Sequence, residues 1–66
     1  MTVGEKLRKQ RRRMKKRQRD IAKAVGVTQP TVHAWESDKW SPRVEQIRDV
    51  AKAYGLEPAD LLPRSS

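Results

Sequence analysis

The chain has 66 residues, no cysteine, one histidine and a formal net charge of +8 at pH 7. A chain of this length forms one small domain that buries only about 60% of its unfolded surface, and it contains neither a disulfide nor a cysteine metal site. A lone histidine cannot build a metal centre, and no apolar run approaches the roughly 20 residues that span a bilayer. We therefore expect no cofactor, membrane contact or small-molecule substrate, and with no secretory signal the default location is the cytoplasm. The expected domain covers residues 1–63, and residues 64–66 form a tail.

The positive charge is concentrated at the N-terminal end. Residues 1–19 contain ten of the sixteen basic residues and a single acid, Glu5, so this segment carries +9 and the remainder carries −1. A segment this basic beside a nearly neutral remainder favours a polyanionic partner. The alternative is a solvated helix face without a partner.

Residues 2–15 are predicted to form the first helix. Thr2 and Glu5 have the spacing of a capping box. The inner stripe of this helix contains Val3, Leu7 and Met14, and it also contains Arg11. Because a basic residue in an apolar stripe requires an acidic partner, Arg11 is expected to form an ion pair.

Two short helices with a tight turn between them follow. Residues 18–25 form the first, with Ile21, Ala22 and Val25 facing inward, and Gly26 fits the left-handed position after its end. Thr28 is the predicted N-cap of the next helix, which ends at residue 36. Pro30 is harmless in its first turn, and Val32 and Trp35 point to the core. This arrangement can expose one side of the second helix, which can then enter the DNA major groove.

The rest of the chain predicts two further helices. One spans residues 42 or 43 to 54, ends at Gly55 and has an inner stripe of Val44, Ile47, Val50, Ala51 and Tyr54. The other spans residues 57–62, with Pro58 at its first position and Pro63 stopping it. No segment alternates with a period of two, so the predicted class is all-α, a compact bundle of five short helices with a helix-turn-helix.

Several motifs occur in a fixed order and spacing. They are LRxxR at 7–11, Gln18, IAxxVGVTQ at 21–29, WE at 35–36, SP at 41–42, AKAYGL at 51–56 and PADLL at 58–62. Together they resemble the Cro/repressor-type, lambda-repressor-like helix-turn-helix family of phage and bacterial regulators. The resemblance implies a five-helix bundle whose third helix is the recognition helix. The chain departs from the pattern at Lys15 and Lys16, where the family often has Gly and an apolar residue, at Asp38 near a usual Gly, and at Pro30.

The third helix is predicted to contact DNA bases. The candidates are Gln29, Pro30, Thr31, His33 and Ala34. Gln29 is the strongest, because a glutamine at this end of the helix can bond an adenine edge bidentately, whereas Pro30 removes a side chain that often reads a base. The alternatives are that Gln29 is only solvated and that His33 is exposed and contacts nothing.

A second group is predicted to contact the DNA backbone. It consists of Lys16, Arg17, Gln18, Thr28, Lys39, Trp40, Ser41 and Arg43. The resemblance implies that the Gln18 side chain bonds the backbone and braces Gln29. Trp40 either lies against a sugar–phosphate strand or covers the end of the fourth helix. The resemblance also supports an ion pair between Arg11 and Glu36, which stands beside Trp35.

No catalytic arrangement is visible, so the chain is not expected to be an enzyme. We predict a sequence-specific regulator of transcription that binds double-stranded DNA, most simply a Cro-like repressor. It would bind a pseudo-palindromic operator as a homodimer, at least on DNA. One alternative is the N-terminal domain of a longer immunity repressor or an antitoxin-type regulator. Another is a basic RNA- or ribosome-binding module that uses the arginine-rich first helix.

Overall fold

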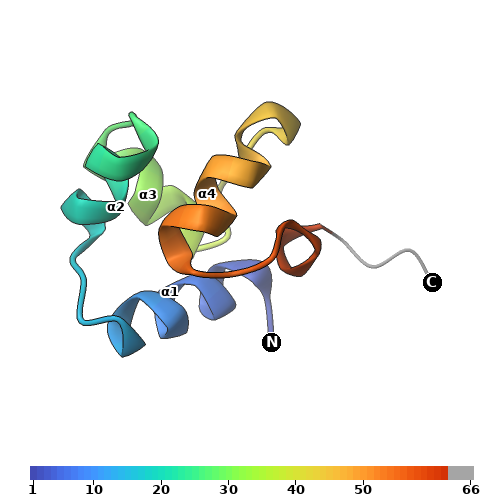
Figure 1. Ribbon diagram of the computed structural model, residues 1–66, viewed down its shortest axis with the longest axis horizontal. Coiled ribbons are helices and arrows are strands. Elements are labelled where there is room, and N and C mark those ends of the chain that lie inside the picture. Colours follow the sequence, from blue (N-terminus) through green and yellow to red (C-terminus); the bar gives the residue numbers. More distant parts are fainter. Residues whose placement is uncertain (63–66) are drawn as a thin grey trace.

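The computed structural model describes residues 1–62 and contains only helices and connecting turns in that range (Figure 1). The α-helices are α1 (Val3–Arg13), α2 (Gln18–Val25), α3 (Gln29–Glu36) and α4 (Ile47–Tyr54), and the 3-10 helices are η1 (Val44–Gln46) and η2 (Pro58–Leu61). The all-α prediction is confirmed. The prediction of five short helices is inexact, because the last predicted helix is only the 3-10 helix η2. The predicted stop at Pro63 and the predicted tail at 64–66 lie outside the described residues.

Local sequence signals account for most helix ends. Thr2 forms the predicted capping box: its hydroxyl accepts from the Glu5 N–H at 3.1 Å, and the Glu5 carboxylate accepts from the Thr2 N–H at 3.3 Å. Gly26 and Gly55 end α2 and α4 with φ of 87° and 67°. Both values lie in the left-handed region that glycine adopts without steric cost. The two predicted glycine stops are therefore confirmed.

The fourth predicted helix begins differently in the structure. It begins as η1 at Val44 and becomes α-helical only at Ile47. A 3-10 segment has about three residues per turn, so it shifts the register of the apolar stripe predicted for an α-helix. Val44 is accordingly 83% exposed and does not belong to the inner stripe.

The core lies where the four α-helices meet. Its largest fully buried side chains are Tyr54, Leu7, Ile21, Val32 and Val50. In Figure 1, α1 runs beneath α2, α3 and α4, and α1 packs against both α3 and α4. The first helix of the chain thereby closes the core that the helix-turn-helix leaves open. No helix within residues 1–62 is long and apolar enough to cross a membrane.

Asp38 joins the end of α3 to the beginning of α1. Its carboxylate accepts from the Thr2 hydroxyl at 2.6 Å and from the Gly4 N–H at 2.9 Å. The hydrogen bond from Thr2, followed by that from Gly4, lowers the pKa of Asp38. Asp38 has φ of 61°, a conformation that favours glycine, and its side chain also caps α1 through the Gly4 N–H.

Lys15 takes a left-handed conformation in the link between α1 and α2. Its φ is 58°, and α1 ends at Arg13, two residues earlier than predicted. Lys15 therefore takes a conformation that favours glycine, at a position where the resemblance leads us to expect glycine. A left-handed non-glycine residue costs roughly 1–2 kcal/mol.

Replacing Lys15 by glycine should therefore leave the free energy of unfolding unchanged or raise it by up to about 1 kcal/mol, since the released strain outweighs the added chain entropy. Lys16→Gly is the matched control, because it removes the same charge at a neighbouring position without a positive φ. It should lower the free energy of unfolding by about 0.5–1 kcal/mol. Thermal unfolding of both variants tests this, and equal destabilisation would show that Lys15 is not strained.

Candidate nucleic-acid interface

The helix-turn-helix consists of α2, the turn at Gly26 and Val27, and α3. Val32 is fully buried and Trp35 is 3% exposed, so both anchor α3 in the core as predicted. The opposite side of α3 is open, with Gln29, Pro30 and His33 exposed and Thr31 half-buried. Burial of one side of α3 thus presents its other side to a partner.

Two predicted details of α3 are different in the structure. Thr28 is the N-cap residue, but its hydroxyl bonds the Thr31 hydroxyl at 2.9 Å in place of a backbone N–H. Ala34 is only 5% exposed, so the prediction that it faces outward with Thr31 and His33 is wrong. Ala34 still lines a hollow together with Gln29, Pro30 and His33, but it has only a small apolar surface left for a base.

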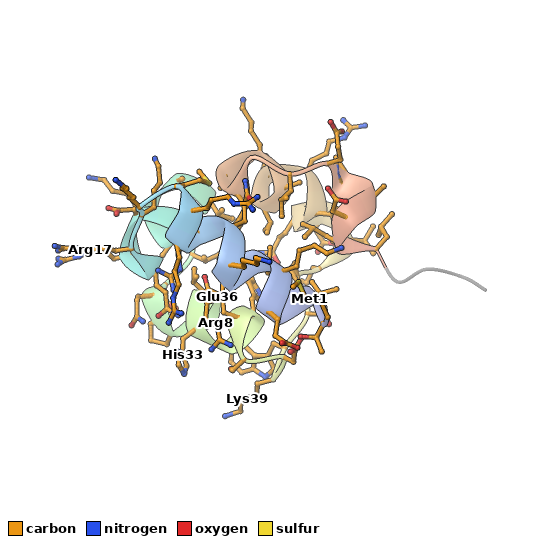
Figure 2. All side chains as sticks on the ribbon, turned by 90° about the horizontal axis from the view of Figure 1, so that it is seen from below. Met1, Arg8, Arg17, His33, Glu36 and Lys39 are labelled. Carbon is orange, nitrogen blue, oxygen red and sulfur yellow. The ribbon has the colours of Figure 1, made fainter. Side chains whose placement is uncertain are left out.

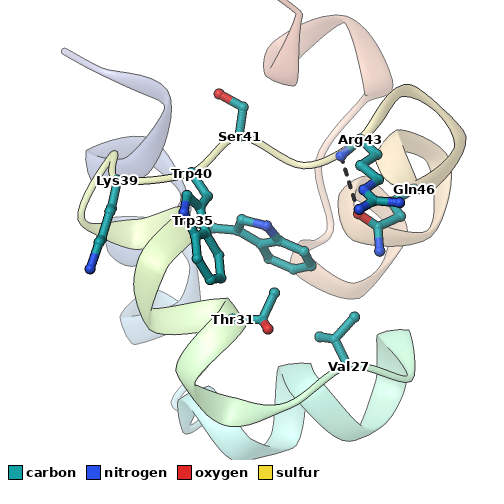
Figure 3. Close-up of a pocket in the computed structure, with 8 residues that line it drawn as sticks. All are labelled: Val27, Thr31, Trp35, Lys39, Trp40, Ser41, Arg43 and Gln46. Atoms are coloured by element: carbon teal, nitrogen blue, oxygen red, sulfur yellow. Dashed lines mark hydrogen bonds between the residues drawn. The ribbon is translucent and has the colours of Figure 1, made fainter.

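Three hollows follow one another along this side of the molecule. The first, about 380 Å³, is lined by Arg11, Arg17, Gln18, Arg19 and Gln29. The second, about 490 Å³, is lined by Gln29, Pro30, His33, Ala34, Lys39 and Trp40. The third, about 660 Å³, is lined by Val27, Thr31, Trp35, Lys39, Trp40, Ser41, Arg43 and Gln46 (Figure 3). Gln29 belongs to the first two hollows, and Lys39 and Trp40 belong to the last two, so the three form one continuous surface, which we call the α3 face.

The α3 face is positively charged. Its lining residues include Arg17, Arg19, Lys39 and Arg43 and no acid. Arg17, His33 and Lys39 project outward where α2 and α3 lie (Figure 2). The face therefore combines cations at its two ends with the exposed polar side of α3 between them, which is the distribution that a protein needs to hold phosphates on both sides of a groove.

Most residues predicted to contact the DNA backbone lie on or beside this face. Arg17, Gln18, Lys39, Ser41 and Arg43 line its hollows, whereas Lys16 and Thr28 are exposed at the two turns that flank α2. Trp40 is 56% exposed and lines the second and third hollows together with Lys39. Its contact with a sugar–phosphate strand stays a prediction.

Glu36 joins all four α-helices beneath the α3 face. It is 3% exposed and accepts hydrogen bonds from Arg11 Nε at 2.8 Å, Arg11 Nη2 at 2.9 Å, Tyr54 OH at 2.7 Å and Gln18 Nε2 at 3.2 Å. The predicted ion pair between Arg11 and Glu36 is confirmed. Arg11 also donates from Nη1 to the Lys16 carbonyl at 3.0 Å, which ties the α1–α2 link to the same cluster.

These contacts keep Glu36 ionised. Burial by itself would raise the pKa of Glu36, but the hydrogen bonds from Arg11, Tyr54 and Gln18 outweigh it and the pKa lies below its usual value. The same hydrogen bond to Glu36 raises the pKa of Arg11. Burial, followed by the hydrogen bond to Glu36, raises the pKa of Tyr54. A buried carboxylate, held as an acceptor, is thus a fixed part of the site.

Gln18 connects this cluster to the exposed end of α3. Its Oε1 accepts from Gln29 Nε2 at 2.6 Å, so the expectation that Gln18 braces Gln29 is confirmed. The Gln18 Nε2 also lies 3.5 Å from His33 Nδ1. The side chain of Gln29 is therefore held by a chain of hydrogen bonds that begins at Glu36.

Two residues of this site are not among those that the sequence predicts. Arg19 is exposed and lines the first hollow beside Arg17, although the sequence indicates only that it belongs to the basic segment. The spacing of the fourth helix places Tyr54 in the inner stripe but predicts no role for its hydroxyl. A tyrosine in an otherwise aliphatic stripe is a usable signal, because a buried hydroxyl needs a partner.

The fold and this face define a helix-turn-helix protein. Residues 2–64 match the family model described as a helix-turn-helix domain, and the chain belongs to that family. Among curated proteins it is similar to the repressor protein C2 of Salmonella phage P22, with 33% identity over 60 residues that cover 91% of this chain and 28% of that protein. The chain therefore spans less than a third of that relative's length.

A solved structure shows a close likeness in three dimensions. It is the P22 c2 repressor protein in complex with the synthetic operator 9T, which matches with a TM-score of 0.89 and 32% identity over 94% of each chain. The resemblance to phage helix-turn-helix repressors that the motifs indicated is thus confirmed.

Proposed function

We propose that this chain is a sequence-specific repressor of transcription that binds double-stranded DNA and inserts α3 into the major groove. The observation that carries the proposal is the α3 face, which places exposed polar groups of α3 between two sets of cations with no acid among its lining residues. The likeness to a repressor–operator complex supports it. Repression would be steric, because a bound protein excludes polymerase from the promoter.

In the proposed complex, Gln29 contacts a base edge, with Thr31 and His33 as lesser contributors and Pro30 offering an apolar surface. Arg17, Lys39 and Arg43 contact phosphates, together with Lys16, Thr28, Trp40 and Ser41. The side-chain amide of Gln18 is already hydrogen-bonded within the protein, so a phosphate would meet the backbone N–H at the start of α2.

We further propose that two copies bind a pseudo-palindromic operator. In helix-turn-helix proteins of this kind the two half-sites lie about one helical turn, roughly 10–12 base pairs, apart. A footprint at saturating protein should therefore cover both half-sites. Protection of a single half-site would contradict the dimeric arrangement.

The decisive test compares Gln29→Ala with Lys39→Ala on the preferred duplex and on random duplex. The preferred duplex is first obtained by selection from random sequences. Gln29→Ala should cost about 1–3 kcal/mol on the preferred duplex and little on random duplex, because the phosphate contacts remain. Lys39→Ala should weaken binding to both duplexes alike. Equal loss on both duplexes for Gln29→Ala would mean that α3 is not the reading helix.

Competition with duplex RNA separates this proposal from its alternative. An arginine-rich helix that recognises RNA would prefer the RNA duplex, whereas the α3 face requires the wide major groove of B-form DNA. We expect duplex DNA of the preferred sequence to compete far better than duplex RNA of the same sequence.

Affinity should also fall steeply with salt. About 6–8 neutralised phosphates give a slope of log K against log salt near −5 to −7. Arg17→Gln should make this slope shallower by about 1 for each bound copy. Lys9→Gln is the matched control, because Lys9 is exposed on α1 in a hollow with Arg8 and Arg12, outside the α3 face. A change of slope for Lys9→Gln but not for Arg17→Gln would place the DNA on α1.

A further inference from the structure

We propose that the outward side of α1 is a second surface for duplex DNA, which binds phosphates without regard to sequence and independently of α3. A copy bound to DNA through the α3 face can then hold a second segment of duplex at the same time. This inference goes beyond the proposed function, which uses only the α3 face, and it rests on that function only for the first of the two segments.

Four exposed cations form this side of the helix, which we call the α1 outer face: Arg8, Lys9, Arg12 and Arg13. The first three of them line one hollow of about 260 Å³ together with Met1 and Glu5. Leu7 is fully buried on the other side of the helix and fixes α1 in the core. The α1 outer face is therefore a rigid, preformed row of cations.

The charge of the α1 outer face is not neutralised within the domain. The one ion pair within residues 1–62 joins Arg11 to Glu36, beneath the α3 face. Glu5 is the only acid in the hollow, and its carboxylate accepts from the N–H and the hydroxyl of Thr2 at 3.3 Å and 3.1 Å. It is thus held in the capping box, and the four cations keep their charge for an external anion.

The fold gives no reason for these charges in the middle of α1. Arg8 and Arg12, like Lys9 and Arg13, are four residues apart, a spacing at which like charges oppose helix formation. The helix dipole favours Arg12 and Arg13 in the last turn, but it does not favour Arg8 and Lys9. A polyanion bound at this face would offset the repulsion, which is the physical reason to infer one.

The α1 outer face is separate from the α3 face. The hollow on α1 shares no residue with the three hollows of the α3 face. In Figure 2, α1 crosses in front of the domain, whereas Arg17, His33 and Lys39 project beyond its outline. A short straight duplex on the α3 face therefore leaves the α1 outer face free for a second segment.

Duplex DNA fits this surface better than a membrane or RNA. A helix that lies on a membrane buries its apolar side in lipid, but the apolar side of α1 is used in the core. The deep, narrow groove of duplex RNA does not admit a helix that is fixed in a domain. Lys9 and Arg13 lie about 6 Å apart along the helix axis, within reach of the dense phosphates of a DNA duplex. Long DNA bound at the α3 face also supplies further segments at high local concentration.

The first test measures the α1 outer face without an operator. The full chain carries Arg17→Gln and Lys39→Ala, which weaken the α3 face, and the probe is random-sequence duplex DNA. Adding Lys9→Gln and Arg12→Gln should lower the affinity at least about tenfold at low salt and make the slope of log K against log salt shallower by about 2.

The matched control adds Arg48→Gln and Lys52→Gln to the same background. These two cations are exposed on α4 and line none of the hollows of the two faces, and their replacement removes the same charge. We expect the control to change affinity by less than about twofold, because salt screens distant charges. An equal loss for the two pairs would show that only net charge matters and would overturn the proposal.

The second test detects two duplexes on one protein. The preferred duplex is immobilised, saturated with the full chain and washed, and labelled random duplex is then added. The parent should retain the labelled duplex, and Lys9→Gln with Arg12→Gln should release it while keeping affinity for the preferred duplex within about twofold. Retention that is unchanged in this variant would show bridging through two α3 faces and would overturn the proposal.

Three further results complete the test. Circular dichroism should show that the variants are folded, because the replaced side chains are exposed, and Arg8→Gln with Arg13→Gln provides a second pair on the same face. Retention of labelled duplex RNA in preference to duplex DNA would assign the surface to RNA and overturn the proposal. If no sequence is preferred but binding still depends on Lys9 and Arg12, the proposed function fails and this inference stands; a preferred duplex with no such dependence gives the reverse.

Discussion

Replacing Glu36 by glutamine should lower the free energy of unfolding by about 3–5 kcal/mol, because it leaves a largely buried guanidinium without its carboxylate. The side chains of Arg11 and Glu36 are only 13% and 2% exposed. Glu36 is also the acceptor that α1, α2 and α4 share at the end of α3. For a domain of this size, this corresponds to a fall in Tm of at least about 12 °C.

Thermal unfolding measures this effect, and Glu45→Gln is the matched control. Glu45 lies exposed in η1, so the same chemical change there should stay within about 0.5 kcal/mol of the parent. A Glu36→Gln variant that melts within a degree or two of the parent would show that the pair contributes nothing.

A double-mutant cycle isolates the pair from the other contacts of Glu36. Arg11→Met combined with Glu36→Gln should cost less than the sum of the two single changes, because no unpaired charge remains. Additive losses would instead assign the effect to Tyr54 and Gln18.

The contribution of Glu36 to the free energy of unfolding should decrease at low pH. Its pKa is lowered in the folded state, so the contribution is complete above the pKa of an unfolded glutamate, about 4.3, and is lost as pH falls through the folded pKa. The acid-induced loss of stability should therefore be smaller in the Arg11→Met, Glu36→Gln double variant than in the parent.

The second large effect is expected at Gly4, where alanine should lower the free energy of unfolding by about 2–3 kcal/mol through overpacking. A Cβ atom at Gly4 would lie 2.7 Å from the carbonyl oxygens of both Trp35 and Glu36. These are backbone atoms at the end of α3, so the clash can be relieved only if α1 moves away from α3. The Asp38 bond to the Gly4 N–H would be stretched by the same movement.

Lys9→Ala on the same helix is the control for this substitution. Lys9 is exposed, so alanine there should change stability by no more than about 0.5 kcal/mol. Urea unfolding of both variants provides the comparison. A Gly4→Ala variant as stable as the parent would mean that α1 and α3 are not in close contact at this point.

The ends of the helices could be predicted from sequence because they depend on neighbouring residues. Thr2 with Glu5, Gly26 and Gly55 each act within one helical turn, and the structure has them in the predicted roles. The inner residues of α2 and α3 also followed from spacing, since a period of 3.6 residues selects one face. The family resemblance supplied a further contact of the site, the brace between Gln18 and Gln29.

The contacts between helices were decided only by the tertiary structure. Whether Ala34 is buried, which acceptor the Tyr54 hydroxyl finds and why Gly4 carries no side chain all depend on how closely α1 and α4 approach α3. Helix crossing is set by all the packed side chains together, and no short window of sequence contains that information. The sequence by itself thus determined the capping residues of the helices and the residues of α3 that face the core, whereas packing buried Ala34 and placed Glu36 beneath the α3 face as a common acceptor.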